Sequence, residues 1–174
     1  MRRVVQAGLL IPLAWLALLA RAAQPIAPRA TDCIDEAAAY RQVSPTVLRA
    51  IAWHESRMRE DAVSRNSNGS VDLGAFQINS IHLPRLSRER IGRTELLDGC
   101  VSAYVAAWHL RQQIDRYGPT WEAVGAYHSR TPALNRRYAQ AIAGVARRVE
   151  AGQSSARHPV SSDQTDTGAR EQRR

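Results

Sequence analysis

The sequence predicts an α+β domain that is mostly α-helical. Helix start signals, in which Ser, Thr or Asp precedes Pro, Gly or an apolar run, recur through the middle of the chain. Residues 60–80 break the helical period and contain the turn signal Asn68-Gly69. Of the 174 residues, 44% are hydrophobic and 23% charged. This composition suits one packed core and excludes disorder throughout the chain.

The N-terminal residues 1–22 are typical of a signal peptide. A positive Met1-Arg2-Arg3 is followed by a mostly apolar run, and Ala20-Arg21-Ala22 fits a small-x-small cleavage site. An uncleaved membrane anchor is the alternative, because the apolar run approaches the length that spans a bilayer. In both cases the rest of the chain is expected to be exported.

The exported part is expected to hold one domain between two unstructured segments. Residues 23–31 contain two prolines and are predicted to be a linker. Residues 151–174 contain almost no apolar side chains and are predicted to be a disordered tail. The folded domain is therefore expected at 32–150.

The first predicted helix begins at Pro45 and runs to about Met58. Ser44 before it is a favoured N-cap, and proline is favoured at the first helical position. The next segment, 60–80, is expected to be a loop with at most short strands.

Three further helices are expected in the second half of the domain. One follows Asp98-Gly99, ends at Tyr117 and is stopped by Gly118-Pro119. A short helix capped by Thr120 comes next, and a last helix begins at Thr131-Pro132. The last helix is predicted to bury an apolar stripe formed by Leu134, Tyr138, Ile142, Val145 and Val149.

The two cysteines, Cys33 and Cys100, are expected to form a disulfide, because an exported chain meets an oxidising compartment. The bond would close a loop of roughly 70 residues, for which chain entropy suggests about 4 kcal/mol of stabilisation. Two cysteines are too few for a zinc ribbon or an iron–sulfur cluster.

The chain is strongly basic, with 24 Lys and Arg against 16 acidic residues and a formal net charge of +8. This charge predicts an anionic partner. Nucleic acid is not expected as that partner, because the arginines are scattered and the chain is exported.

Glu55 is the candidate catalytic acid. It lies about 20° from Leu48 around the predicted helix, in the middle of the apolar stripe and close to the C-terminal end. Burial and the negative end of the helix dipole both raise the pKa of a carboxyl, as a proton donor near neutral pH requires. The alternative is an ion pair with Arg59 on the next turn.

Three segments resemble the signature motifs of the lytic transglycosylases. They are Ala-Ile-Ala-Trp-His-Glu-Ser at 50–56, Gly-Ala-Phe-Gln-Ile-Asn at 74–79 and Gly-Ala-Tyr-His at 125–128. Asn-Gly-Ser-Val-Asp at 68–72 keeps the family's spacing before the second motif. The match covers about 33–149 and is best with the small soluble-transglycosylase-like proteins that accompany secretion, conjugation and pilus machines.

The resemblance implies a lysozyme-like fold and cleavage of peptidoglycan between N-acetylmuramic acid and N-acetylglucosamine, with no cofactor and no metal. Glu55 would protonate the glycosidic oxygen and then accept the proton of the muramoyl C6 hydroxyl, which closes on C1 to give a 1,6-anhydro sugar. The substrate supplies the nucleophile, unlike in two-carboxylate glycosidases.

The resemblance also implies location and partners. We expect a periplasmic monomer that binds peptidoglycan glycan strands and serves components of a secretion, conjugation or pilus apparatus. A lysozyme-type muramidase and a non-enzymatic assembly subunit are the alternatives.

Five further residues are candidates for substrate binding. Gln77 and Tyr127 match family positions that line the cleft, although a loop amide and a core tyrosine would look the same. Ser56 could equally cap the helix end, and Asn79 could fix the loop. His128 stands where the commonest third motif has asparagine.

Asp72 admits two interpretations. It could be a second carboxylate of the kind that hydrolytic lysozymes use, or a turn aspartate bonded to its own backbone, which the sequence favours. A zinc hydrolase is excluded, because His54-Glu55-x-x-Met58 lacks the second histidine of that motif.

Overall fold

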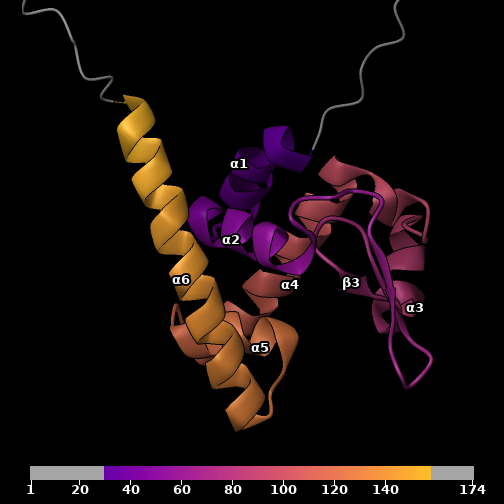
Figure 1. Ribbon diagram of the computed structural model, residues 1–174. Coiled ribbons are helices and arrows are strands. Elements are labelled where there is room, and N and C mark those ends of the chain that lie inside the picture. The colour runs from indigo at the N-terminus through magenta and orange to yellow at the C-terminus, as the bar shows by residue number, and fades with distance from the viewer. Residues whose placement is uncertain (1–29, 158–174) are drawn as a thin grey trace, which may run out of the picture.

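The computed structural model describes residues 30–157, which form a helical body with a small sheet on one side (Figure 1). The long helices are α1 (Ala30–Arg41), α2 (Pro45–Ser56), α4 (Gly99–Tyr117), α5 (Trp121–His128) and α6 (Pro132–Arg157). The strands are β1 (Val63–Arg65), β2 (Val71–Leu73) and β3 (Ile78–Asn79). Short helical turns connect β3 to α4, namely η2 (Ser80–His82), α3 (Leu83–Leu86), η3 (Ser87–Glu89) and η4 (Glu95–Leu97). The predicted mostly α, α+β architecture is confirmed.

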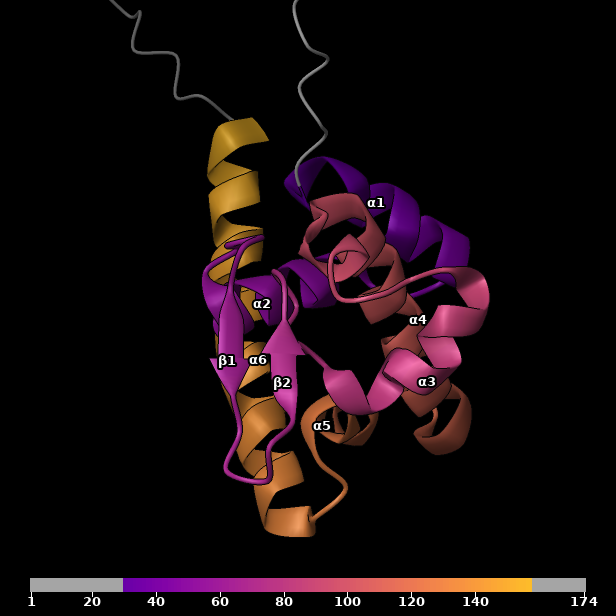
Figure 2. The ribbon, with the colours of Figure 1, turned by 90° about the vertical axis from the view of Figure 1, so that its right-hand side faces the viewer.

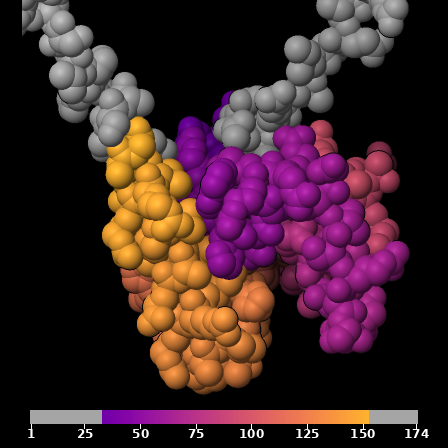
Figure 3. Space-filling model, in the orientation of Figure 1, coloured from indigo at the N-terminus to yellow at the C-terminus, as the bar shows by residue number. Residues whose placement is uncertain are grey.

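The helices and the sheet occupy opposite sides of the molecule. Helix α6 packs along α2 and α5, and α1 packs on α4, whereas the sheet and α3 lie on the side away from α6 (Figures 1 and 2). The sheet is antiparallel in the order β1-β2-β3, and Asp72 pairs with both Ser64 and Asn79. The space-filling view shows a hollow between the sheet and the segment of α5 and α6 (Figure 3).

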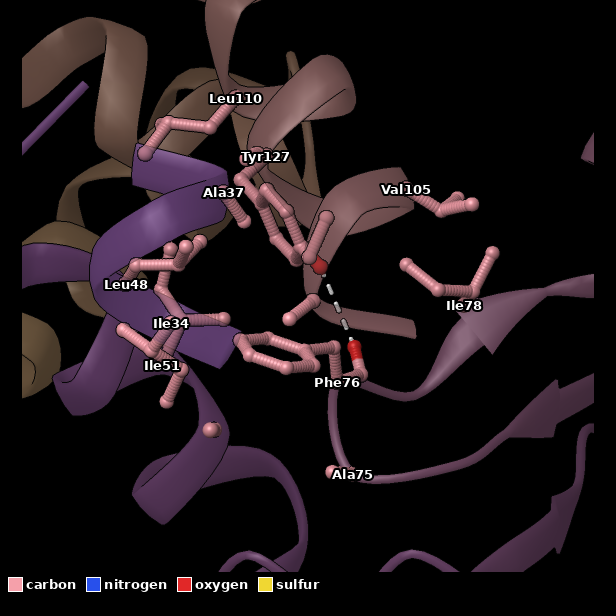
Figure 4. Close-up of a cluster of buried hydrophobic side chains, with 14 of the residues drawn as sticks. Ile34, Ala37, Leu48, Ile51, Ala75, Phe76, Ile78, Val105, Leu110 and Tyr127 are labelled. Carbon is pink, nitrogen blue, oxygen red and sulfur yellow. Dashed lines mark hydrogen bonds between the residues drawn. The ribbon is translucent and has the colours of Figure 1, made fainter. Parts of the chain in front are cut away.

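The hydrophobic core lies where the helices meet the segment between β2 and β3. Phe76 from that segment is fully buried with Leu48 and Ile51 of α2. The hydroxyl of Tyr127 donates to the Phe76 carbonyl oxygen at 3.2 Å (Figure 4). The core therefore fixes the sheet-side loop relative to α2 and α5.

The predicted helix starts are confirmed at atomic detail. The side chains of Ser44, Asp98 and Thr120 each accept a hydrogen bond from a backbone N–H in the first turn of the following helix. The predicted short strands, and the turn at Gly69 with φ +83°, are present between 60 and 80.

Two details of the predicted helices are wrong. Helix α2 ends at Ser56 instead of Met58, because Arg57 and Met58 adopt left-handed backbone angles with φ of 59° and 63°. Leu134 of the predicted apolar stripe is 47% exposed, whereas Tyr138 and Ile142 are buried. Leu134 lies in the first turn of α6 and lines a surface cavity together with Arg137 and Tyr138.

The helices extend past the predicted domain limits. Helix α1 is not among the predicted helices. It begins at Ala30 and so includes two residues of the predicted linker 23–31. Helix α6 runs to Arg157 and includes seven residues of the predicted tail 151–174. Ala, Gln and Arg in 151–157 are adequate helix formers, and extending a helix costs far less than nucleating one.

The predicted signal peptide 1–22 lies outside the described residues. Among the helices within 30–157, none combines the length and apolar character needed to cross a membrane.

The predicted disulfide is present. Cys33 of α1 is bonded to Cys100 of α4, with Cα atoms 5.1 Å apart. Cys33 is buried in the hydrophobic core, and the bond joins α1 to the 19-residue helix α4.

Candidate active site

Glu55 lies on the wall of a cavity of about 450 Å³ between α2, the sheet and the end of α5. The hollow beside the sheet in Figure 3 lies in this region. Among the lining residues are Glu55, Asp72, Gln77, Asn79, Tyr127 and His128. Of the residues expected at the site, the cavity thus gathers all but Ser56 on its wall.

Burial raises the pKa of Glu55 to about 7, and the nearby charge of Asp72 acts in the same direction. The Tyr138 hydroxyl donates a hydrogen bond to Oε1 of Glu55 at 2.5 Å, which opposes the rise by favouring the carboxylate. Because the pKa is close to neutrality, both the acid and the carboxylate are populated at pH 7. This is the property of a group that gives and later takes a proton.

Arg59 is not placed to neutralise Glu55. The chain leaves the helix after Ser56, so Arg59 does not lie one helical turn from Glu55. Its Nε donates to the Ser56 carbonyl oxygen at 3.2 Å instead. The structural alternative for Glu55, an ion pair with Arg59, is therefore wrong.

Gln77 and Asn79 line the cavity and also hold its loops. The Gln77 amide nitrogen donates to the carbonyl oxygens of Ala62 at 3.2 Å and of Gly74 at 2.9 Å. The Asn79 amide nitrogen donates to Oδ1 of Asp72 at 2.7 Å. Each amide nitrogen is thus occupied by the protein, so a sugar would meet the remaining surface of these side chains.

Asp72 is a strand residue, which corrects the interpretation as a turn aspartate. It lies in β2, where backbone pairing with β1 and β3 fixes its conformation. Its carboxylate accepts hydrogen bonds from the amides of Asn66 at 2.9 Å and Asn79 at 2.7 Å. Two amide donors keep the carboxylate in the cavity that it shares with Glu55.

Ser56 and Tyr127 fasten helices to the segment between β2 and β3. Ser56 is only 5% exposed, and its hydroxyl donates to the Ala75 carbonyl oxygen at 2.8 Å. The Tyr127 hydroxyl makes the equivalent bond to Phe76. Ser56 therefore holds the end of α2 against the segment between β2 and β3, and its contact with substrate stays a prediction.

Tyr138 is the site residue that sequence reasoning missed. It was assigned to the apolar stripe of the last helix, and its ring is indeed buried. Its ring is stacked with His128, at 5.0 Å between centroids, and with Tyr127, at 6.3 Å. Its hydroxyl in an otherwise apolar stripe was the available signal, since a buried Tyr O–H needs an acceptor.

The site continues on the other side of Glu55. A second cavity of about 310 Å³ is lined by Glu55 and His128 together with Leu134 and Arg137 of α6. Glu55 and His128 thus stand between two cavities, the arrangement needed for a chain that extends in both directions from the cleaved bond. Within the described part of the chain, no group of three His, Cys, Asp or Glu side chains could hold a metal ion.

Comparison with known protein families gives a match that covers most of the described residues. The sequence model of the family described as "Transglycosylase SLT domain" matches residues 32–149, which include every site residue named above. The chain belongs to the SLT transglycosylase family.

Several relatives share this SLT domain. The invasion protein IagB of Salmonella typhimurium (strain SL1344) is 40% identical over 116 residues, which cover 64% of this chain and 72% of IagB. The X polypeptide of Escherichia coli is 39% identical over 102 residues, covering 58% of this chain and 60% of that protein. Protein IpgF of Shigella flexneri is 40% identical over 101 residues, covering 58% and 66%.

Proposed function

We propose that this SLT-domain protein is a lytic transglycosylase that cleaves the β-1,4 bond between N-acetylmuramic acid and N-acetylglucosamine without water. The observation that carries the proposal is Glu55, a carboxyl group with a pKa of about 7 that lines two cavities of an SLT domain. A family of transglycosylases and a carboxyl tuned for proton transfer point to the same chemistry.

One carboxyl group is sufficient for both steps. Protonated Glu55 gives its proton to the glycosidic oxygen as the bond to C1 breaks. The resulting carboxylate then takes the proton of the muramoyl C6 hydroxyl while the C6 oxygen bonds to C1, which forms a 1,6-anhydro end and restores the acid. The Tyr138 hydrogen bond stabilises the carboxylate between the two steps.

Hydrolysis of the same bond is the second candidate, and Asp72 is the observation in its favour. Its carboxylate lies in the Glu55 cavity and is held by two amides, so it could stabilise positive charge at C1 or orient water, as in two-carboxylate glycosidases. The chemical identity of the product distinguishes the two candidates.

The cellular role that we propose is local opening of the peptidoglycan for an envelope-spanning secretion, conjugation or pilus machine. Similarity to a protein named for invasion supports this role. We further propose that the protein acts as a monomer in the periplasm, exported by residues 1–22, which have the pattern of a signal peptide.

Replacement of Glu55 tests the proposed enzyme activity. Glu55→Gln keeps the side-chain volume and an acceptor for the Tyr138 hydroxyl but removes the transferable proton. Release of soluble fragments from murein should fall by at least roughly 10²–10⁴-fold, the usual worth of general acid–base catalysis. Glu122→Gln, on exposed α5 surface, is the matched control and should keep wild-type activity. Substantial activity in Glu55→Gln would exclude the mechanism.

A further inference from the structure

A large cavity lies outside the Glu55 site. It has a volume of about 860 Å³ and is bordered by the end of α1, by α3 and η3, and by α4. Figure 2 shows α3 beside α4 on the side away from α6. We call this cavity the arginine groove, after Arg41, Arg85 and Arg88 on its wall.

The arginine groove carries positive charge that the described chain leaves without carboxylate partners. Within 30–157, none of the three arginines forms an ion pair, although Glu89 also lies on the wall. The Nε atom of Arg41 is buried and has no hydrogen-bond partner among the described residues. An unsatisfied buried N–H on a guanidinium is costly. Arg41 is half-buried and lines the groove, so a ligand carboxylate could bind the rest of its guanidinium by charge-assisted hydrogen bonds.

Aromatic side chains make part of the groove flat and apolar. The Arg85 guanidinium lies over the Trp108 ring, 4.7 Å from its centroid, and Tyr104 lines the same wall. A stacked guanidinium keeps its edge N–H groups available for a carboxylate. The groove therefore combines surface for aliphatic side chains with fixed donors for anions.

The arginine groove adjoins the Glu55 cavity. Ile81, which is well exposed, lines both. His82 of the Glu55 cavity packs edge-on against Trp108 of the groove, with ring centroids 6.4 Å apart. One substrate molecule could therefore occupy both cavities at once.

We propose that the arginine groove binds the stem peptide of the peptidoglycan strand whose glycan lies in the Glu55 cavity. The proposal rests on the proposed function, because it needs murein as the substrate. The sugar backbone carries no charge that would use three arginines, whereas the peptide on the muramoyl lactyl group carries free carboxylates and aliphatic side chains. Bidentate carboxylate binding by arginine supplies the recognition.

The test compares two substrates with two matched variants. Soluble glycan strands with intact peptides, and the same strands freed of peptides by an amidase, are digested by the wild type and by Arg85→Ala/Arg88→Ala. Both arginines are exposed, so the double variant should fold. Arg147→Ala/Arg148→Ala removes the same charge from exposed α6 surface and is the control.

The proposal predicts that the groove variant loses about tenfold or more in kcat/KM on peptide-bearing strands, the factor expected from one charge-assisted hydrogen bond. Its kcat/KM on peptide-free strands should equal that of the wild type, and the control should match the wild type on both.

Two results would overturn the proposal. An unchanged rate on peptide-bearing strands would show that the groove binds something else, such as an acidic segment of a protein partner. An equal loss on both substrates would show a general charge effect. If the wild type cleaves neither substrate, the proposed function fails. Binding of the two kinds of strand to the wild type and to the groove variant then decides the groove separately, because preference for peptide-bearing strands must still be lost in the variant.

Discussion

Glu55 owes its chemical character to residues that are distant in the sequence. Burial between α2 and the sheet raises its pKa, the charge of Asp72 adds to the effect, and Tyr138, 83 residues further along the chain, opposes it. The pKa of Glu55 therefore depends on tertiary structure, and it can be altered by removing one of these interactions at a time.

Removal of the Tyr138 hydroxyl should raise the pKa of Glu55 further. Tyr138→Phe keeps the ring stack with His128 but removes the donor that stabilises the carboxylate. Since the acid form starts the reaction, activity should persist to higher pH. The alkaline limb of kcat/KM should move up by about one pH unit, which corresponds to about 1.4 kcal/mol, the low end for a hydrogen bond to a charged group. A pH–rate profile on murein measures this shift.

Tyr117→Phe is the control for that profile, because Tyr117 lines a different cavity. Its alkaline limb should coincide with that of the wild type. If the limb of Tyr138→Phe stays in place or moves to lower pH, the Tyr138 hydrogen bond does not tune Glu55.

At the scale of elements, the segment between β2 and α4 contributes Gln77 and Asn79 to the cavity and is packed tightly against the rest of the fold. Gly74, with φ +74°, brings the chain so close to η4 that an added Cβ would lie 2.0 Å from the Leu96 carbonyl oxygen. Gly69 has a similar φ of +83°, but its Cβ would meet no atom within 4 Å. Comparing substitutions at the two glycines therefore distinguishes the cost of a positive φ from the cost of a steric clash.

Gly74→Ala should therefore destabilise the protein far more than Gly69→Ala. The shared positive φ costs each variant about 1–2 kcal/mol. The collision with Leu96 should add at least about 2 kcal/mol for Gly74→Ala, as overpacking in a buried position does. Urea unfolding of both variants measures the difference. Equal losses would mean that the Gly74 segment can shift away from Leu96 at little cost.

The difference between contacts within one element and contacts between elements explains which parts of the fold could be predicted. Helix starts were predictable because Ser44, Asp98 and Thr120 cap helices through neighbours three residues away. The position of Glu55 on the apolar face of α2 could also be predicted, because it depends only on the spacing of neighbouring residues in the sequence. The roles of Tyr138 and Asp72 were not, because each depends on a partner from another element.

At the scale of the whole molecule, the disulfide joins α1 to α4 and encloses the segment that carries Glu55 and the sheet. The cross-link acts mainly by restricting the unfolded chain. The hydrogen bonds of Ser56 and Tyr127 hold the site independently of it.

Cys33→Ser/Cys100→Ser should lower the free energy of unfolding by about 4 kcal/mol, the chain-entropy value for a loop of this length. Denaturant unfolding of the variant and of the wild type measures the loss. Murein cleavage well below the unfolding midpoint should be retained. Thiol labelling of unreduced wild-type protein should detect no cysteine, and two labelled cysteines would contradict the pairing.

The central claim, that one carboxyl group and the substrate's own hydroxyl complete the reaction, is tested most directly by the mass of the products. Muropeptides released from purified murein by the wild-type protein should end in 1,6-anhydro-N-acetylmuramic acid, each lighter by one water than a hydrolysed end. Label from H₂¹⁸O should not appear in them. Reducing muramoyl ends that carry the label would contradict the account and would assign Asp72 to a hydrolytic mechanism.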